Sequence, residues 1–171
     1  MKLLVSAFLI ILSAGCADSH QLVKQQSAEL KLSAKDTIYV SVPKDGFYGT
    51  KVYMGSGMNT STIIYSAFAK RTHTVNMGQA IQNFDEALTT ARADNRRFLV
   101  FPTILRWEDR ATEWSAIPDK VEVKIEVVDS LSGNTISSGI ISGKSGLATF
   151  GGDHPQDLLP ASVEEYVESL Y

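Results

Sequence analysis

Apolar and charged residues alternate without a break in Val121-Glu-Val-Lys-Ile-Glu-Val127, and this short segment indicates the architecture of the whole domain. Such alternation is typical of a β-strand with one face buried and the other in water. The turn sequence Asp129-Ser-Leu-Ser-Gly-Asn134 follows, so we expect Thr135 to Ser142 to return as an adjacent antiparallel strand. Upstream, Phe98-Leu-Val-Phe101 is apolar throughout, as in a central strand covered on both faces, and this strand is expected to continue to Trp107.

Two strand–helix steps are predicted before this group of strands. The first strand is β-branched and aromatic and ends at Pro43. The predicted elements are, in order, a strand over Thr37–Val42, a helix from Asn59 or Thr60 to about Lys70, a short strand over His73–Met77 and a helix from about Gln79 to Ala93. The second helix has the clearest apolar stripe, formed at three- and four-residue spacing by Ala80, Ile81, Phe84, Ala87, Leu88 and Ala91.

A last helix is expected at the carboxyl end, where Pro160 is acceptable only within the first turn. Its buried face is predicted to comprise Leu159, Val163, Tyr166, Val167 and Leu170. The elements then follow the order β-α-β-α-β-β-β-α. This order predicts an α/β (α+β) fold in which residues 37–171 form one domain, a single mixed β-sheet with helices packed on it.

The composition excludes several classes of protein. The chain has 171 residues, of which 44% are hydrophobic and 20% charged, so disordered, collagen-like and coiled-coil chains are excluded. Its formal charge is −3, which provides no basic surface for a nucleic acid partner. The single cysteine excludes a disulfide framework within the chain and any CxxC metal or redox motif.

The amino terminus has the pattern of an export signal. Met1-Lys2 is followed by a mainly apolar run over Leu3–Leu12, which is too short to span a membrane but has the length of a secretory signal. The small residues Ser13-Ala14-Gly15 then precede Cys16 and resemble the bacterial lipobox, although Ser13 stands where Leu is usual. We expect residues 1–15 to be a lipoprotein signal peptide and Cys16 to carry lipid; an ordinary signal peptide cut after Ala14 or Gly15, or a retained anchor, are the alternatives.

Residues 16–36 are then predicted to be the lipidated terminus and a tether to the membrane. The segment is rich in Gln, Ser, Lys and Ala, and a short helix within Gln21–Leu32 is an alternative. The residue after the cysteine is Ala17 and not the Asp that marks inner-membrane retention in Gram-negative lipoproteins. This resemblance implies an outer-membrane lipoprotein that faces the periplasm, if the source is Gram-negative.

The order of elements, with the turn Asp129-x-x-x-Gly133, resembles a superfamily of envelope proteins. It includes the amino-terminal domain of the translocation protein TolB, curli-secretion lipoproteins and lipoprotein activators of penicillin-binding proteins. The pattern Pro43-x-Asp-Gly-x-Tyr-Gly49, followed by Tyr53-x-Gly-Ser-Gly57, is similar to that of a family of short uncharacterised bacterial lipoproteins with a domain of unknown function. This resemblance implies a location and a fold but no activity.

The same loop is the first candidate for a functional surface. Gly55-Ser-Gly57 before a helix could bind an anion, but neither a P-loop nor a dinucleotide fingerprint is complete. Alternatively, the glycines serve tight turns and the hydroxyls cap the helix. Aromatic residues with polar tips favour a third interpretation, contact with a partner. The candidate partner-binding residues are Asp45, Gly46, Phe47, Tyr48, Gly49, Tyr53, Gly55, Ser56 and Gly57.

A second candidate surface is the predicted hairpin tip that carries both tryptophans, Trp107 and Trp114. Its carboxylates, Glu108, Asp109 and Glu113, could form an acid/base pair or a metal site. Arg106 and Arg110 are interleaved with them, which favours local ion pairs on a solvated edge. Contact of the tryptophans with a partner or a glycan is the other interpretation.

No motif for catalysis or for a metal is present in the sequence. His20, His73 and His154 lie far apart, without HExxH spacing, and no Gly-x-Ser-x-Gly elbow occurs. We therefore expect no catalytic or metal-binding residues, no cofactor apart from the lipid on Cys16, and a non-enzymatic module that binds or assembles an envelope protein or glycan. A membrane-surface enzyme acting on a small molecule or a cell-wall component is the alternative. A curli-like ring is less favoured, because the strand pair is joined by a short turn.

Overall fold

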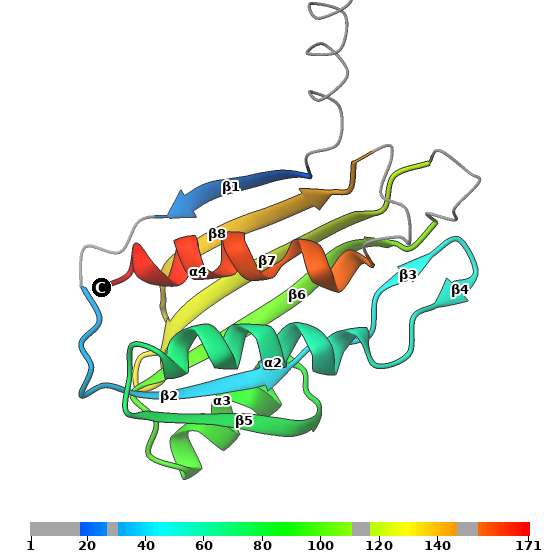
Figure 1. The fold of residues 1–171 in the computed structure, drawn as a ribbon. Coiled ribbons are helices and arrows are strands. Elements are labelled where there is room, and N and C mark those ends of the chain that lie inside the picture. The colour runs from blue at the N-terminus through cyan, green and yellow to red at the C-terminus, as the bar shows by residue number, and fades with distance from the viewer. Residues whose placement is uncertain (1–17, 27–30, 111–116, 147–153) are drawn as a thin grey trace, which may run out of the picture.

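A computed structural model describes residues 18–26, 31–110, 117–146 and 154–171. These residues form a six-stranded sheet in the order β1-β8-β7-β6-β2-β5, and a two-stranded sheet of β3 (Phe47–Tyr48) and β4 (Lys51–Val52) projects beyond it (Figure 1). The main strands are β1 (Ser19–Gln26), β2 (Thr37–Val42), β5 (Thr74–Ile81), β6 (Phe98–Glu108), β7 (Lys120–Asp129) and β8 (Thr135–Lys144). The helices are α2 (Ser56–Ala69), α3 (Phe84–Ala93), the 3-10 helix η2 (Pro155–Leu158) and α4 (Pro160–Glu168).

The sheet is mixed, as predicted. β2 pairs in parallel with β5 on one side and with β6 on the other, and the connections run through α2 and α3. β6, β7, β8 and β1 pair antiparallel in that order. α2 and α4 lie side by side over one face, and α3 covers part of the other (Figure 1). The predicted fold class is therefore confirmed.

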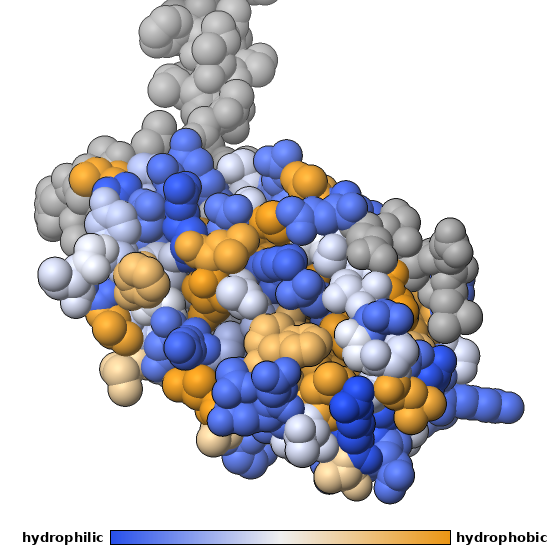
Figure 2. Space-filling model, turned by 180° about the vertical axis from the view of Figure 1, so that it is seen from behind, coloured by the Kyte–Doolittle hydropathy of each residue, from blue (hydrophilic) through white to orange (hydrophobic). Residues whose placement is uncertain are grey.

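The alternation in β7 places its apolar side chains in the main core. Val121, Val123, Ile125 and Val127 are buried beneath α2 and α4, whereas the charged residues between them are half-buried on the opposite face. Figure 2 shows that opposite side of the molecule, with hydrophilic side chains interspersed among hydrophobic ones. A smaller core lies under α3, where Tyr39, Ala87, Leu88, Ala91, Leu99 and Val128 are buried together. All five residues predicted for the buried face of the last helix are buried, and Pro160 is in its first turn.

The prediction of a tether is wrong for residues 19–26, which form β1 at the edge of the main sheet. Leu22 pairs with Ile141 of β8 and packs against the main core. The Asp18 carboxylate accepts a hydrogen bond from the backbone N–H of Gly146 at 2.9 Å. A helix within Gln21–Leu32 is not formed over the residues described there. The strand is hard to recognise because Leu22 is its only apolar side chain that faces the core.

Two helix starts also differ from the prediction. α2 begins at Ser56, before Asn59, because Gly55 in the left-handed region (φ 86°) turns the chain into the helix. α3 begins at Phe84, so Ala80 and Ile81 belong to β5 and not to the helix stripe. The Asn83 side chain accepts from the backbone N–H of Glu86, and the Glu86 carboxylate accepts from that of Asn83. This capping box specifies the start of α3.

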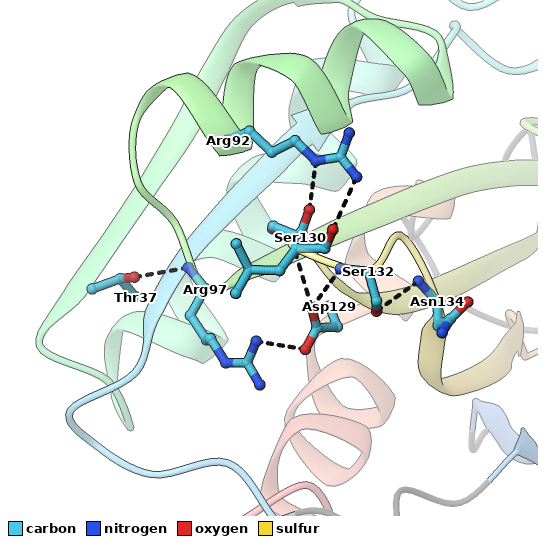
Figure 3. A network of polar contacts seen from close by, with 8 residues as sticks. Thr37, Arg92, Arg97, Asp129, Ser130, Ser132 and Asn134 are labelled. Carbon is cyan, nitrogen blue, oxygen red and sulfur yellow. Dashed lines mark hydrogen bonds and ion pairs between the residues drawn. The ribbon is translucent and has the colours of Figure 1, made fainter.

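The turn between β7 and β8 is fastened to α3 by a polar network (Figure 3). The Asp129 carboxylate accepts from the backbone N–H groups of Leu131 and Ser132 and pairs with the Arg97 guanidinium. Arg92 of α3 donates to the carbonyls of Ser130 and Leu131. Burial alone would raise the pKa of Asp129, but the hydrogen bonds and Arg97 outweigh it and lower that pKa. These contacts hold the predicted turn between β7 and β8 in place, which is a structural role.

Several predictions concern residues outside those described, namely the signal peptide, Cys16, Trp114 and Glu113. Among the described helices, none has both the length and the apolar character needed to cross a membrane.

Candidate functional site

The loop from β2 to α2 carries a small projecting hairpin. β3 (Phe47–Tyr48) and β4 (Lys51–Val52) pair antiparallel, and Gly49 takes a positive φ of 58° in the turn between them. In Figure 1 this hairpin extends past the ends of the main strands. The loop is therefore ordered by its own backbone pairing and by contacts with β6.

The base of the hairpin is attached to the start of α2. The Asp45 carboxylate accepts from the backbone N–H of Gly57 at 2.8 Å and from the Ser56 hydroxyl at 3.4 Å. The Ser56 hydroxyl oxygen also accepts from the backbone N–H of Gly46 at 2.8 Å. The Asp45 carboxylate thus occupies the start of α2, where the sequence also allowed a bound anion. This favours the other interpretation, in which the glycines serve tight turns and polar groups of the chain cap the helix.

Trp107 is 2% exposed and lies in the main core, so the prediction that it forms a contact surface is wrong. Gly46 passes directly over it, and a Cβ at Gly46 would lie 2.5 Å from the Cβ of Trp107. A glycine is needed at this position because the loop backbone and the indole are in close contact. Gly57 is similarly restricted, since its Cβ would lie 2.3 Å from the carbonyl oxygen of Pro43.

Charged groups at the end of β6 hold the side of the hairpin. The Arg110 guanidinium donates to the Tyr48 hydroxyl at 2.9 Å and lies 4.8 Å from the centre of that ring. Arg110 and Arg106 also pair with Glu108, at 2.9 Å and 3.6 Å. The Tyr53 hydroxyl donates to the carbonyl oxygen of Asp109 at 3.2 Å. The predicted local ion pairs of this region are confirmed for the residues that the structure describes.

Above this fixed base, the hairpin exposes apolar side chains. Phe47 is 68% exposed, Val52 53% and Met54 85%, and Tyr48 is also exposed, at 42%. We call these four residues the hairpin surface. Phe47 and Tyr48 were predicted as contact residues, whereas Val52 and Met54 were not, because single apolar residues in a glycine-rich loop do not reveal their exposure. Exposed aromatic and methionine side chains are enriched where proteins meet.

Two hollows flank the hairpin. One has a volume of about 340 Å³ and lies at the carboxyl ends of β2 and β5, where Phe47, Phe84 and Phe101 contribute aromatic walls. The rings of Phe84 and Phe101 meet edge to face, with centroids 5.4 Å apart. The other, of about 400 Å³, is lined by Lys51 and Val52 of β4. It includes Asp109 and His154, whose side chains approach to 3.5 Å. Both hollows are open to solvent beside the hairpin surface.

The three histidines have different surroundings in the fold. His20 contacts the carbonyl oxygen of Leu158 at 3.1 Å, His73 is exposed before β5, and His154 pairs with Asp109. Within the described ranges, no three His, Cys, Asp or Glu side chains are grouped so that they could hold a metal ion.

The family is established by comparison of the sequence with protein-family models. The model of a domain of unknown function, DUF4823, matches residues 30–170. The chain belongs to this family. No curated protein matches the DUF4823 chain.

Solved structures share the fold of this DUF4823 chain at low sequence identity. A PelC dodecamer from Paraburkholderia phytofirmans has a TM-score of 0.68 at 15% identity, covering 90% of this chain and 97% of PelC. Lipoprotein GNA1162 from Neisseria meningitidis has a TM-score of 0.50 at 13% identity, covering 77% of this chain and 96% of its own. Protein XCC0632 from Xanthomonas campestris has a TM-score of 0.52 at 10% identity, covering 85% and 87%. The predicted membership of a family with a domain of unknown function is confirmed, and these structures share the predicted fold.

Proposed function

We propose that the chain is an envelope lipoprotein, anchored through lipid on Cys16, whose domain binds or helps to assemble another envelope component through the hairpin surface. The observation that carries this proposal is the exposure of Phe47, Val52 and Met54 on a hairpin whose base is fixed to α2 and to Trp107. A preformed apolar surface loses little conformational entropy on binding, which favours association. The lipoprotein GNA1162 among the structural neighbours supports the envelope location.

The chemistry of the hairpin surface favours a protein partner over a glycan. Val52 and Met54 present aliphatic and thioether groups, which bury well against an apolar protein surface. The aromatic hollow of about 340 Å³ beside Phe47 could receive an apolar side chain of the partner. The expected contact is therefore an apolar centre with Arg110 and Lys51 at its rim.

Photo-crosslinking in cells tests this surface directly. A photoreactive phenylalanine analogue at Phe47 or Met54 is expected to trap one envelope protein reproducibly. The matched control is Leu131, which is 78% exposed but lies in the β7–β8 turn. Equal trapping from position 131, or trapping from none of the three positions, would contradict a docking role of the hairpin surface. Crosslinking of a glycan at positions 47 and 54 would support the hairpin surface as the contact site but would refute a protein as its partner.

The anchor requires a separate test. Metabolic labelling with palmitate is expected to mark the wild-type chain and not Cys16→Ser. The Cys16→Ser chain should also leave the membrane fraction, because two or more acyl chains are needed for stable attachment. An unlabelled wild type, or a Cys16→Ser chain in an unchanged fraction, would refute the anchor without affecting the crosslinking result.

A membrane-surface enzyme remains the second candidate function, and one observation favours it. Asp109 and His154 approach to 3.5 Å in the hollow of about 400 Å³, a pair that can transfer a proton. Substitution His154→Gln should leave crosslinking from Met54 unchanged if the chain is a binding module. An envelope defect in cells that carry His154→Gln, with trapping intact, would favour the enzyme.

A further inference from the structure

Both margins of the main sheet are open in the described part of the chain. β5 pairs only with β2, and β1 pairs only with β8 (Figure 1). In an edge strand, backbone N–H and C=O groups that point outward have no ladder partner, so the strand can template pairing with another chain. This fold therefore has two places at which a further strand could be added.

The β5 edge lacks the side chains that most often prevent strand addition. Its eight residues, Thr74-Val-Asn-Met-Gly-Gln-Ala-Ile81, include no charge and no proline. Gln79, Ala80 and Ile81 are exposed, Ile81 at 51%. Natural edge strands are commonly protected by lysine, proline, short length or a bulge. Of these devices β5 has only a bulge, between Met77 and Ile81, whereas Thr74–Met77 pairs regularly with β2. The regular part of this edge can accept an added strand.

The β1 edge has the same length as β5 and runs antiparallel to it, and it carries one lysine, Lys24, beside a bulge. β1 also has eight residues. The pairings in the sheet make β1 antiparallel to β5, so a second copy in the same orientation would bring its β1 beside β5 as an antiparallel strand. Leu22 of β1 and Val75 and Met77 of β5 all pack against the main core, on the face covered by α2 and α4. Joining the two edges would make this apolar layer continuous between copies.

We propose that copies of this chain associate head to tail, with β1 of one copy added antiparallel to β5 of the next. The repeated contact covers both open edges of each copy, whereas pairing of β5 with a second β5 would leave every β1 edge open. A head-to-tail contact is heterologous, so it closes into a ring when the rotation between copies is a simple fraction of a turn. The inference does not rest on the hairpin surface, which belongs to β3, β4 and the residues next to them and not to an edge of the main sheet.

Charge on the β5 edge tests the proposal. The wild-type chain, purified in detergent, is expected to form a closed oligomer in native mass spectrometry. Gln79→Lys together with Ala80→Lys should shift the oligomer to monomer, with at least a tenfold loss in association constant, because repeated lysines repel and oppose edge pairing. The matched control is Thr62→Lys with Thr89→Lys, which adds the same charge at exposed positions of α2 and α3. An oligomer unaffected by the β5 lysines, or a wild type that is monomeric at all concentrations, would overturn the inference.

Cysteine pairs identify which edges meet. Gln21→Cys lies in β1 and Gln79→Cys lies in β5, and both positions are exposed. A short bismaleimide should join the two variants only when they are mixed. Efficient joining of Gln79→Cys to itself would indicate a two-fold β5–β5 contact and refute the head-to-tail arrangement. Refutation of the head-to-tail association would not alter the outcome expected for palmitate labelling or for crosslinking from Met54. The association and the proposed function can therefore fail independently.

Discussion

The Asp45 carboxylate accepts a hydrogen bond from the backbone N–H of Gly57, twelve positions further along the chain, at 2.8 Å. This bond closes the loop that carries the hairpin surface and caps α2 from outside the helix. A cap supplied by a residue outside the helix couples the loop to α2, since movement of the loop would expose the first turn of the helix. The hairpin is therefore positioned by the helix on which it borders.

Removal of this cap should destabilise the domain. Asp45→Ala is expected to lower the free energy of unfolding by about 1–2 kcal/mol, because the Gly57 N–H and the Ser56 hydroxyl lose their acceptor. Asp45→Asn, which keeps an acceptor oxygen, should lose clearly less. Urea unfolding followed by circular dichroism measures both changes. Equal losses for Asp45→Ala and Asp45→Asn would show that charge and not capping is responsible.

Two aromatic residues should differ sharply in their effect on stability. Trp107→Ala is expected to cost roughly 3–5 kcal/mol, because the indole is buried against Gly46 and the core. Phe47→Ala should cost less than about 0.5 kcal/mol, since that ring is 68% exposed. The same unfolding experiment measures both. A large loss for Phe47→Ala would mean that the hairpin surface belongs to the core rather than to an interface.

The lowered pKa of Asp129 predicts a loss of stability in acid. Its folded-state pKa lies below the unfolded value, so the carboxylate stabilises the fold above the unfolded pKa, and this contribution is lost as the pH falls through the folded pKa. Asp129→Asn should therefore reduce stability at neutral pH and flatten the acid side of the pH–stability curve. Glu165→Gln, at an exposed position of α4, is the control. It should change neither the stability at neutral pH nor the acid side of the curve. A wild-type curve that matches Asp129→Asn would refute the role of the network.

Tyr166 predicts the opposite dependence in alkali. Burial raises its pKa to about 12, above the ordinary value of 10.0, and its hydroxyl lies 3.1 Å from that of Ser137. The contribution of this tyrosine is fully present below pH 10 and is lost as the pH rises through 12, by up to about 2–3 kcal/mol. Tyr166→Phe should remove that slope. Absorbance titration of the phenolates should show one ionisation fewer at the alkaline end, and an unchanged titration would contradict the assignment.

Much of the fold could be predicted because its signals are local. The alternation in Val121–Val127, the turn after Asp129 and the apolar run from Phe98 each depend on near neighbours, and the structure contains all three as expected. The start of α3 was misplaced because the spacing of Ala80, Ile81 and Phe84 fits a helix, whereas pairing with β2 holds the first two in a strand. Phe47 and Tyr48 were recognised by residue type alone.

The sequence by itself determined the order of the main elements from Thr37 onward, the glycine-dependent turns and the periodic pattern of core residues, because these follow from backbone preferences and short-range periodicity. Only the tertiary structure decided that Trp107 is buried, that Asp45 caps a helix, that Ser19–Gln26 adds a strand, and that β1 and β5 are the outer strands of the main sheet over the residues described. Those outcomes depend on contacts between residues far apart in the chain. The burial of a residue outside a periodic pattern, such as Trp107, and the edge position of a strand are properties of the assembled sheet.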